Sequence, residues 1–103
     1  MQRYLFEASP KHPVGVSPRP GVSPGPTNGQ AALDSSVSLG PNTPRRVGID
    51  YDTGEFAVFD ETYPGRGLFH GHVRGWEQLE QGMQNALRRG GMVNRRGGIV
   101  VGE

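Results

Sequence analysis

Apolar and polar residues alternate in three short stretches in the second half of the chain. Residues 47–51 and 55–59 each show the period of two that is typical of a β-strand. Between them, residues 52–54 end in a glycine that can adopt positive φ, so the pattern predicts a β-hairpin with a three-residue connection closing in a bulge. A turn at residues 63–65 leads into a third predicted strand at about 68–74.

The period then changes to that of a helix over residues 76–87. One helical stripe collects the apolar side chains, namely Trp76, Leu79, Met83, Ala86 and Leu87. Gly90 and Gly91 end the helix, and the preceding arginine pair lies in the last turn, where the helix dipole favours cations. After a turn at residues 94–97, residues 99–101 are expected to return as a short strand beside the hairpin.

The first half of the chain differs from the second in its high proline content. Eight of the nine prolines precede residue 45, partly in an imperfect tandem unit at residues 15–20 and 21–26. Since proline cannot donate a backbone hydrogen bond, we interpret residues 1–44 as a largely disordered or extended linker, with a short helical turn at residues 31–33. No aromatic anchors flank the repeat, which favours a spacer over a proline-rich ligand. Residues 45–103 are the predicted folded domain.

Composition limits the chemistry. The chain has 103 residues and no cysteine, which excludes disulfides and thiolate metal sites, and no apolar run approaches the length of a membrane helix. We expect no cofactor, no bound metal and no membrane insertion by this domain. The net charge is only +1, but ten of the eleven basic residues are arginines, whose planar fork suits phosphate. Paired arginines are also common as simple solvated surface.

The third strand carries the candidate chemistry. Alternation directs His70, His72 and Arg74 to one polar face and the intervening residues to the core. The two imidazoles are then about 7 Å apart, since a strand advances ~3.3 Å per residue. Cleavage of an RNA phosphodiester without a metal needs a base, an acid and a cation for the developing charge. Two histidines and an arginine can fill these roles, and the sequence does not say which histidine is the base.

Further residues are candidates for substrate binding. Acidic side chains could raise a histidine pKa or act as an alternative base, and tyrosines could stack on nucleobases. Asp50 belongs to the acidic group. The substrate-binding candidates are Arg45, Arg46, Tyr51, Asp60, Glu61 and Tyr63.

Simpler interpretations stay open. The histidines could be ordinary half-buried strand residues. They could bind zinc with Asp60 or Glu61, although a zinc site usually needs three or four protein ligands and His12 lies in the predicted linker. Trp76 is most simply a core anchor of the helix. A non-catalytic RNA- or protein-binding module and a metal-dependent nuclease are alternative functions.

These segments resemble a known protein family. The hairpin at residues 45–62, the third strand, the tryptophan-led helix and residues 91–97 are similar to C-terminal toxin domains of bacterial polymorphic toxins, of the Rhs and contact-dependent inhibition types. The resemblance implies the α+β ribonuclease fold of the barnase, colicin D and RelE-like group, in which a small antiparallel sheet packs against a helix. It also implies an endoribonuclease, often against tRNA, secreted as the tip of a larger toxin. Such a toxin acts in the target-cell cytoplasm and is neutralised by a cognate immunity protein.

Overall fold

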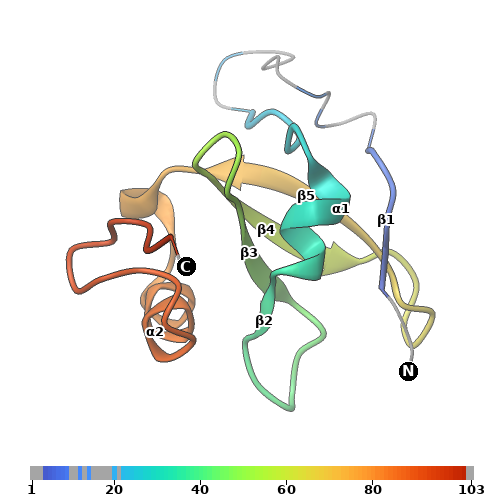
Figure 1. Cartoon of the computed structure of the whole chain (residues 1–103). Helices are drawn as coiled ribbons and strands as arrows, with labels where there is room; N and C mark the ends of the chain where they lie inside the picture. The colour runs from blue at the N-terminus through green and yellow to red at the C-terminus, as the bar shows by residue number, and fades with distance from the viewer. Residues whose placement is uncertain (1–3, 10–11, 13, 15–19, 21, 102–103) are drawn as a thin grey trace.

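A curled five-stranded sheet with two α-helices forms the fold (Figure 1). The structure, a computed structural model, describes residues 4–9, 12, 14, 20 and 22–101. Its elements are β1 (Leu5–Phe6), α1 (Gly29–Asp34), β2 (Val37–Ser38), β3 (Arg46–Asp50), β4 (Glu55–Glu61), β5 (Leu68–Arg74), the 3₁₀ helix η1 (Trp76–Gln78) and α2 (Gln81–Arg89). The sheet order is β1-β5-β4-β3-β2, with β1 parallel to β5 and the other pairs antiparallel. The predicted α+β class is confirmed.

The central hairpin joins β3 to β4. Val47 pairs with Val58 and the last pair is Asp50 with Glu55, so the predicted hairpin is confirmed. Tyr51, which the alternation placed in the strand, instead begins a four-residue connection. The turn starts early because the Gly54 amide donates to the Asp50 carbonyl at 2.8 Å, and Gly54 adopts a φ of +75°.

Hydrophobic clusters cover both faces of the sheet. We call these faces the α2 face and the α1 face. The cluster on the α2 face comprises Val47, Ile49, Phe56, Val58, Leu79, Met83, Ala86, Leu87, Met92 and Val93. The cluster on the α1 face comprises Ala32, Leu33, Ala57, Phe59 and Phe69. The side chains of one strand therefore alternate between two cores, rather than between a core and water.

The segment expected to be a linker contributes to this fold. From it come β1, which pairs with β5, the helix α1 with the buried residues Ala32 and Leu33, and β2 at the other sheet edge. The first repeat unit lies, except for Pro20, outside the described residues. In the second unit the Pro24 carbonyl accepts a hydrogen bond from the Val73 amide at 2.8 Å. Proline removes only the donor, so its carbonyl can still pair with a strand.

The predicted C-terminal helix is shorter than its apolar stripe. Trp76 lies in η1, and α2 begins only at Gln81, because Leu79 and Glu80 have extended backbones with ψ of 135° and 154°. The Gln78 side chain accepts a hydrogen bond from the Gly75 amide at 2.9 Å and closes η1 as a separate turn. The helix ends at Arg89, as predicted from the glycine pair.

Residues 99–101 do not join the sheet. Ile99 instead forms an isolated bridge with Val93, and the Val100 amide donates to the Met92 carbonyl at 2.9 Å. The prediction of a strand beside the hairpin was wrong, because the turn at Asn94 folds this segment back onto the end of α2.

Gly48 allows α1 to approach the sheet. A Cβ atom at this position would collide with the backbone carbonyl oxygen of Ala32, which cannot swing aside. We expect Gly48→Ala to lower the free energy of unfolding by about 2–3 kcal/mol. Gly82 in α2 is the matched control, since its added methyl group meets nothing within 4 Å and should stabilise the helix by about 0.5–1 kcal/mol. Urea unfolding of both variants measures the difference, and equal midpoints would contradict this account of the α1 contact.

Candidate active site

Three polar side chains of β5 lie in a row on the α2 face. In the register His70 lies opposite Asp60, His72 opposite Val58, and Arg74 opposite Phe56. Val58 and Phe56 belong to the core cluster of that face. The predicted alternation of β5 is therefore confirmed, and the two histidines and the arginine lie beyond the edge of this core.

A pocket of about 520 Å³ opens beside the two histidines. Its wall is formed by β4, β5 and the N-terminal segment of the chain. The lining residues are Glu7, Ala8, Ser9, His12, Asp60, Thr62, His70 and His72. The fold thus brings a third imidazole, His12, to the pair that the sequence indicated.

Hydrogen bonds fix the ring of His70. The Thr62 hydroxyl donates to Glu7 Oε1 at 3.3 Å and lies 3.1 Å from His70 Nδ1. Because the hydroxyl has a single hydrogen, it accepts from His70, so Nδ1 carries a proton. This arrangement leaves Nε2 of His70 for chemistry.

His72 is half-buried and stacks on His12. The ring centroids are 5.0 Å apart and the planes differ by 28°. Burial lowers the pKa of His72, and the charges of His12 and Arg74 lower it further, to about 4, against the opposing effect of Asp60. His72 is therefore neutral near pH 7: Asp60 does act to raise its pKa, as expected of an acidic neighbour, but burial and the neighbouring positive charges outweigh this effect.

The tautomer of His12 also follows from its partner. Its Nδ1 lies 2.6 Å from the carbonyl oxygen of Ser23. A carbonyl oxygen only accepts, so His12 Nδ1 donates this hydrogen bond and Nε2 is the remaining ring nitrogen.

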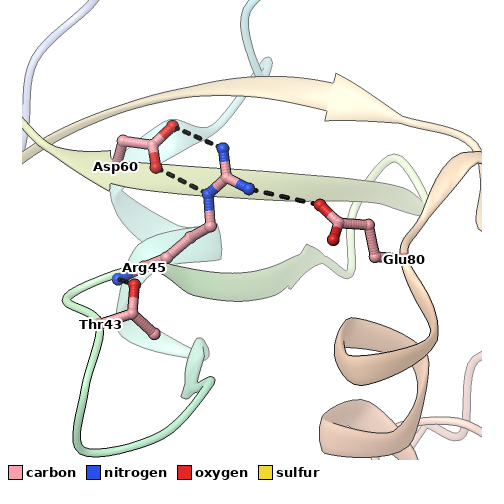
Figure 2. A network of polar contacts seen from close by, with 4 residues as sticks. All are labelled: Thr43, Arg45, Asp60 and Glu80. Atoms are coloured by element: carbon pink, nitrogen blue, oxygen red, sulfur yellow. Dashed lines mark hydrogen bonds and ion pairs between the residues drawn. The ribbon is translucent and has the colours of Figure 1, made fainter.

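Arg45 is held between two carboxylates (Figure 2). Its Nε and Nη2 donate to the two Asp60 oxygens at 2.8 and 3.4 Å, and its Nη1 donates to Glu80 Oε1 at 3.5 Å. The hydrogen bond to Asp60 raises the pKa of Arg45, as do the charges of Asp60 and Glu80, against the effect of burial. The fork of Arg45 therefore orients Asp60 at the pocket, and its charge is largely compensated.

A second hollow of about 260 Å³ lies on the other side of His72. Arg74 lines it together with Arg45, Gln78 and Glu80. His72 therefore separates the histidine pocket from a hollow that carries Arg74. An extended phosphodiester chain could occupy both.

Four predicted binding residues lie elsewhere. Arg46 is on the α1 face, where it donates to Ser36 and covers the ring of Tyr4 at 5.0 Å. Glu61 accepts hydrogen bonds from two amides of the β4–β5 turn, at 3.0 and 2.8 Å. Tyr51 and Tyr63 are exposed and lie in the turns at opposite ends of β4.

Asp50 is also remote from the histidines. It is 1% exposed and accepts hydrogen bonds from the Asn28 amide, the Asn28 side chain and the Asp52 amide. Burial acts to raise the pKa of Asp50, but these bonds outweigh it, so the net pKa is lowered. The carboxylate ties the start of α1 to the hairpin and has no access to the pocket.

The sequence interpretation missed Glu7, His12 and Thr62. Thr62 lies two residues beyond Asp60, just past the end of β4, so continuing the alternation of that strand by one residue could have indicated it. No local signal indicates Glu7 or His12, because their position depends on pairing between distant parts of the chain. Among the described residues, no three His, Asp or Glu side chains are grouped so that they could hold a metal ion. No helix in the described part is long and apolar enough to cross a membrane.

The lowered pKa of His72 makes folding stability depend on pH. The unfolded ring takes up a proton near pH 6.5, but the folded ring does so only near pH 4. Between these values protonation favours the unfolded chain, so stability is complete above pH 6.5 and falls as the pH drops to 4. We expect a loss of about 1–2 kcal/mol for this half-exposed ring. Urea unfolding of the wild type and of His72→Gln at pH 7, 5 and 4 measures this loss as the difference between the two proteins. The contributions of the carboxylates are the same in both and drop out of the difference. If the free energies of unfolding of the two proteins changed equally with pH, His72 would not have a lowered pKa in the folded state.

Comparison with known proteins gives a family. No protein-family model and no curated protein matches this chain. A crystal structure of a CDI (contact-dependent inhibition) complex from Cupriavidus taiwanensis LMG 19424 contains a similar chain, with 53% identity and a TM-score of 0.67. The match covers 72% of this chain and 97% of that one. The chain therefore belongs to the contact-dependent inhibition family represented by that structure, as a domain of the CDI toxin type.

Proposed function

We propose that this domain is a metal-independent endoribonuclease toxin that cleaves tRNA or other RNA in the cytoplasm of a neighbouring cell. In the producing cell a cognate immunity protein would neutralise it. The observation that carries the proposal is the pocket that His70 and His72 share, with Arg74 on the far side of His72. Membership of the contact-dependent inhibition family supports the toxin role, and the ribonuclease chemistry is inferred from the side chains.

His72 suits the role of general base because its ring is neutral near pH 7. In the proposed step His72 takes the proton of the ribose 2′-hydroxyl, and the 2′-oxygen forms a bond to phosphorus. The approach of the phosphate anion favours the protonated ring and therefore raises the pKa of His72 in the complex. This makes His72 a stronger base when substrate is bound.

His70 then acts as the general acid. Its protonated ring gives a proton from Nε2 to the 5′-oxygen as the bond between that oxygen and phosphorus breaks. The products are a 2′,3′-cyclic phosphate and a free 5′-hydroxyl, and each histidine ends in the protonation state of the other. Thr62, which itself donates to Glu7, accepts the hydrogen on Nδ1, so the proton that His70 gives is the one on Nε2.

Arg74 is the cation for the charge that develops on the phosphorane. Within the described residues its guanidinium makes no hydrogen bond or ion pair, whereas that of Arg45 binds Asp60 and Glu80. A cation without a competing carboxylate is worth more to a developing anion. Arg45 contributes by holding Asp60 at the pocket wall.

Incubation of the purified chain with total tRNA in the presence of EDTA tests the proposal. We expect discrete fragments that end in a 2′,3′-cyclic phosphate, which phosphatase alone cannot remove. RNA that stays intact but binds with a steep salt dependence would overturn the ribonuclease proposal in favour of a binding module. Cleavage that requires a divalent ion would instead identify a metal-dependent nuclease.

Expression of the chain in a naive cell tests the toxin role separately. We expect growth arrest, relieved when the open reading frame adjacent to the toxin gene is co-expressed. An arrest that the neighbouring gene does not relieve would contradict the immunity pairing. Normal growth with soluble, folded protein would contradict toxicity itself.

A further inference from the structure

We infer that the N-terminal arm, residues 5–9 and 12, is part of the active site, with Glu7 and His12 as positioning residues for His70 and His72. The inference rests on the proposed function, because it assigns these two side chains to the same reaction. It reverses the interpretation of this segment as a spacer. The arm is anchored to the sheet and to α1, and its polar side chains reach His70 through Thr62 and His72 directly.

The arm is fixed at its start by the sheet and by α1. The Leu5 amide donates to the Gly67 carbonyl and the Glu7 amide to the Phe69 carbonyl, both at 2.8 Å. The Gln30 side chain of α1 clamps the same stretch, accepting from the Phe6 amide and donating to the Tyr4 carbonyl at 2.9 Å each. The ring of Phe6 packs edge-on against Phe59. These contacts fix the register of residues 5–7 against β5.

This register brings Glu7 to His70. Phe6 pairs with Phe69, so Glu7 lies level with His70 on the α2 face, which is the pocket side of β5. Its carboxylate accepts the Thr62 hydroxyl hydrogen, and Thr62 in turn accepts from His70 Nδ1. A carboxylate that acts on an imidazole through one hydroxyl fixes both the tautomer and the ring orientation.

His12 lies against His72 at the other end of the pocket. Its Nδ1 is held by the Ser23 carbonyl, so its ring cannot turn freely, and it covers the His72 ring as a stack. The stack removes rotamers of His72 that would turn the base away from the pocket. The adjacent imidazole also disfavours a proton on His72 and thereby keeps the base neutral.

Neither side chain is needed for the hydrophobic core. Glu7 is exposed and His12 is half-buried, and neither belongs to the clusters on the two sheet faces. Substitutions there should leave folding intact, so their kinetic effects can be read directly. Val14 offers a matched control in the same region, because it is 48% exposed and forms only a backbone bridge with Gly25 among its described strand contacts.

The experiment compares Glu7→Ala, Glu7→Gln, His12→Ala, His12→Phe and Val14→Ala in the full chain, with kcat and KM measured on tRNA across pH. We expect each alanine variant at Glu7 and His12 to lose about 10- to 100-fold in kcat with KM changed by less than about threefold. Glu7→Gln keeps an acceptor for Thr62 and His12→Phe keeps the stacked ring, so both should recover most of the rate. Val14→Ala should match the wild type.

The pH profile separates positioning from a general loss of structure. Because His12 lowers the pKa of His72, its replacement raises that pKa, so the acid limb of kcat/KM moves upward from about pH 4 toward 6.5. The shift should be larger for His12→Ala, which also exposes the His72 ring, than for His12→Phe. Imidazole ¹⁵N NMR follows the same titration without substrate and reports whether Glu7→Ala leaves the Nδ1 proton of His70 in place.

The outcomes are distinct. A wild type that cleaves RNA, with alanine variants that match it in rate and acid limb, would overturn the inference and leave the proposed function standing. A wild type that cleaves no RNA would overturn the proposed function and with it the catalytic role of the arm. In that case NMR shifts of His70 and His72 in the variants would establish the contacts alone. If Val14→Ala also lost rate, the losses in the other variants would reflect weaker packing of the N-terminal region on the sheet. That result would contradict positioning by Glu7 and His12.

Discussion

Replacing His72, the proposed general base, with glutamine is expected to lower the proposed RNA cleavage rate by about 10²–10⁴-fold, the usual contribution of a positioned base. Glutamine keeps the polarity and much of the volume of the ring but cannot take the 2′-hydroxyl proton. The folded protein should survive the change, because His72 is already neutral in it and lies outside both hydrophobic clusters. Initial rates on tRNA at pH 7, with circular dichroism as the measure of folding, check the result.

Arg46→Gln is the control for that variant. Arg46 is on the opposite sheet face and binds Ser36, so its loss should reduce stability slightly while cleavage proceeds at nearly the wild-type rate. If His72→Gln cut RNA as fast as Arg46→Gln did, His72 could not be the base. A comparable loss in both variants would instead indicate that the whole basic surface acts through binding.

Asp50→Ala is expected to have the largest effect on folding, a loss of about 3 kcal/mol in the free energy of unfolding. The variant leaves the Asn28 amide, the Asn28 side chain and the Asp52 amide without their common acceptor in a site that is 1% exposed. For a small domain with a total stability of about 5–10 kcal/mol, this is a large fraction. Urea unfolding monitored by the fluorescence of Trp76 measures it.

Asp52→Ala tests whether the effect belongs to the buried carboxylate. Asp52 is in the same turn but is exposed, so removal of its side chain should change stability by less than about 0.5 kcal/mol. Unfolding measured at acidic pH gives a second check. Because the pKa of Asp50 is lowered in the fold, part of the stability of the wild type disappears as the pH falls through that pKa, and Asp50→Ala should lack this part. Equal losses in both variants would remove the special role of Asp50.

The central part of the fold could be predicted because its signals are local. The hairpin and β5 follow from alternation and from glycine in the connecting turn, and the bounds of β5 coincide with the predicted 68–74. The shared face of His70, His72 and Arg74 is a direct geometric result of a period of two. The end of α2 follows in the same way from Gly90 and Gly91.

Other parts depend on contacts that no short window contains. The strand β1 has two residues, and its pairing with β5 joins the start of the chain to its second half. Proline density suggested a spacer in this region, yet a carbonyl of Pro24 still pairs with β5. Glu7 and His12 inherit their positions from these pairings, so the sequence pattern alone could not assign them to the site.

The helical period of the apolar residues wrongly predicted one continuous helix from Trp76 onward. The apolar stripe from Trp76 to Leu87 is compatible with one helix, but the spacing of side chains does not show where the helical backbone hydrogen bonds are interrupted. The 3₁₀ helix ends at Gln78, and Leu79 reaches the core from an extended backbone. Burial of the stripe was therefore predicted correctly, while the helical path between its members was not.

The parallel pairing of β1 with β5 also has a consequence for the order of folding. The hairpin and α2 form through contacts close in sequence, whereas β1 must close a loop of roughly 60 residues, which is a slower and entropically costlier step. After dilution from denaturant, the fluorescence of Trp76 should therefore recover before the proposed ribonuclease activity does. During refolding there would be an interval in which the hydrophobic core is formed but Glu7 and His12 have not yet reached the proposed site.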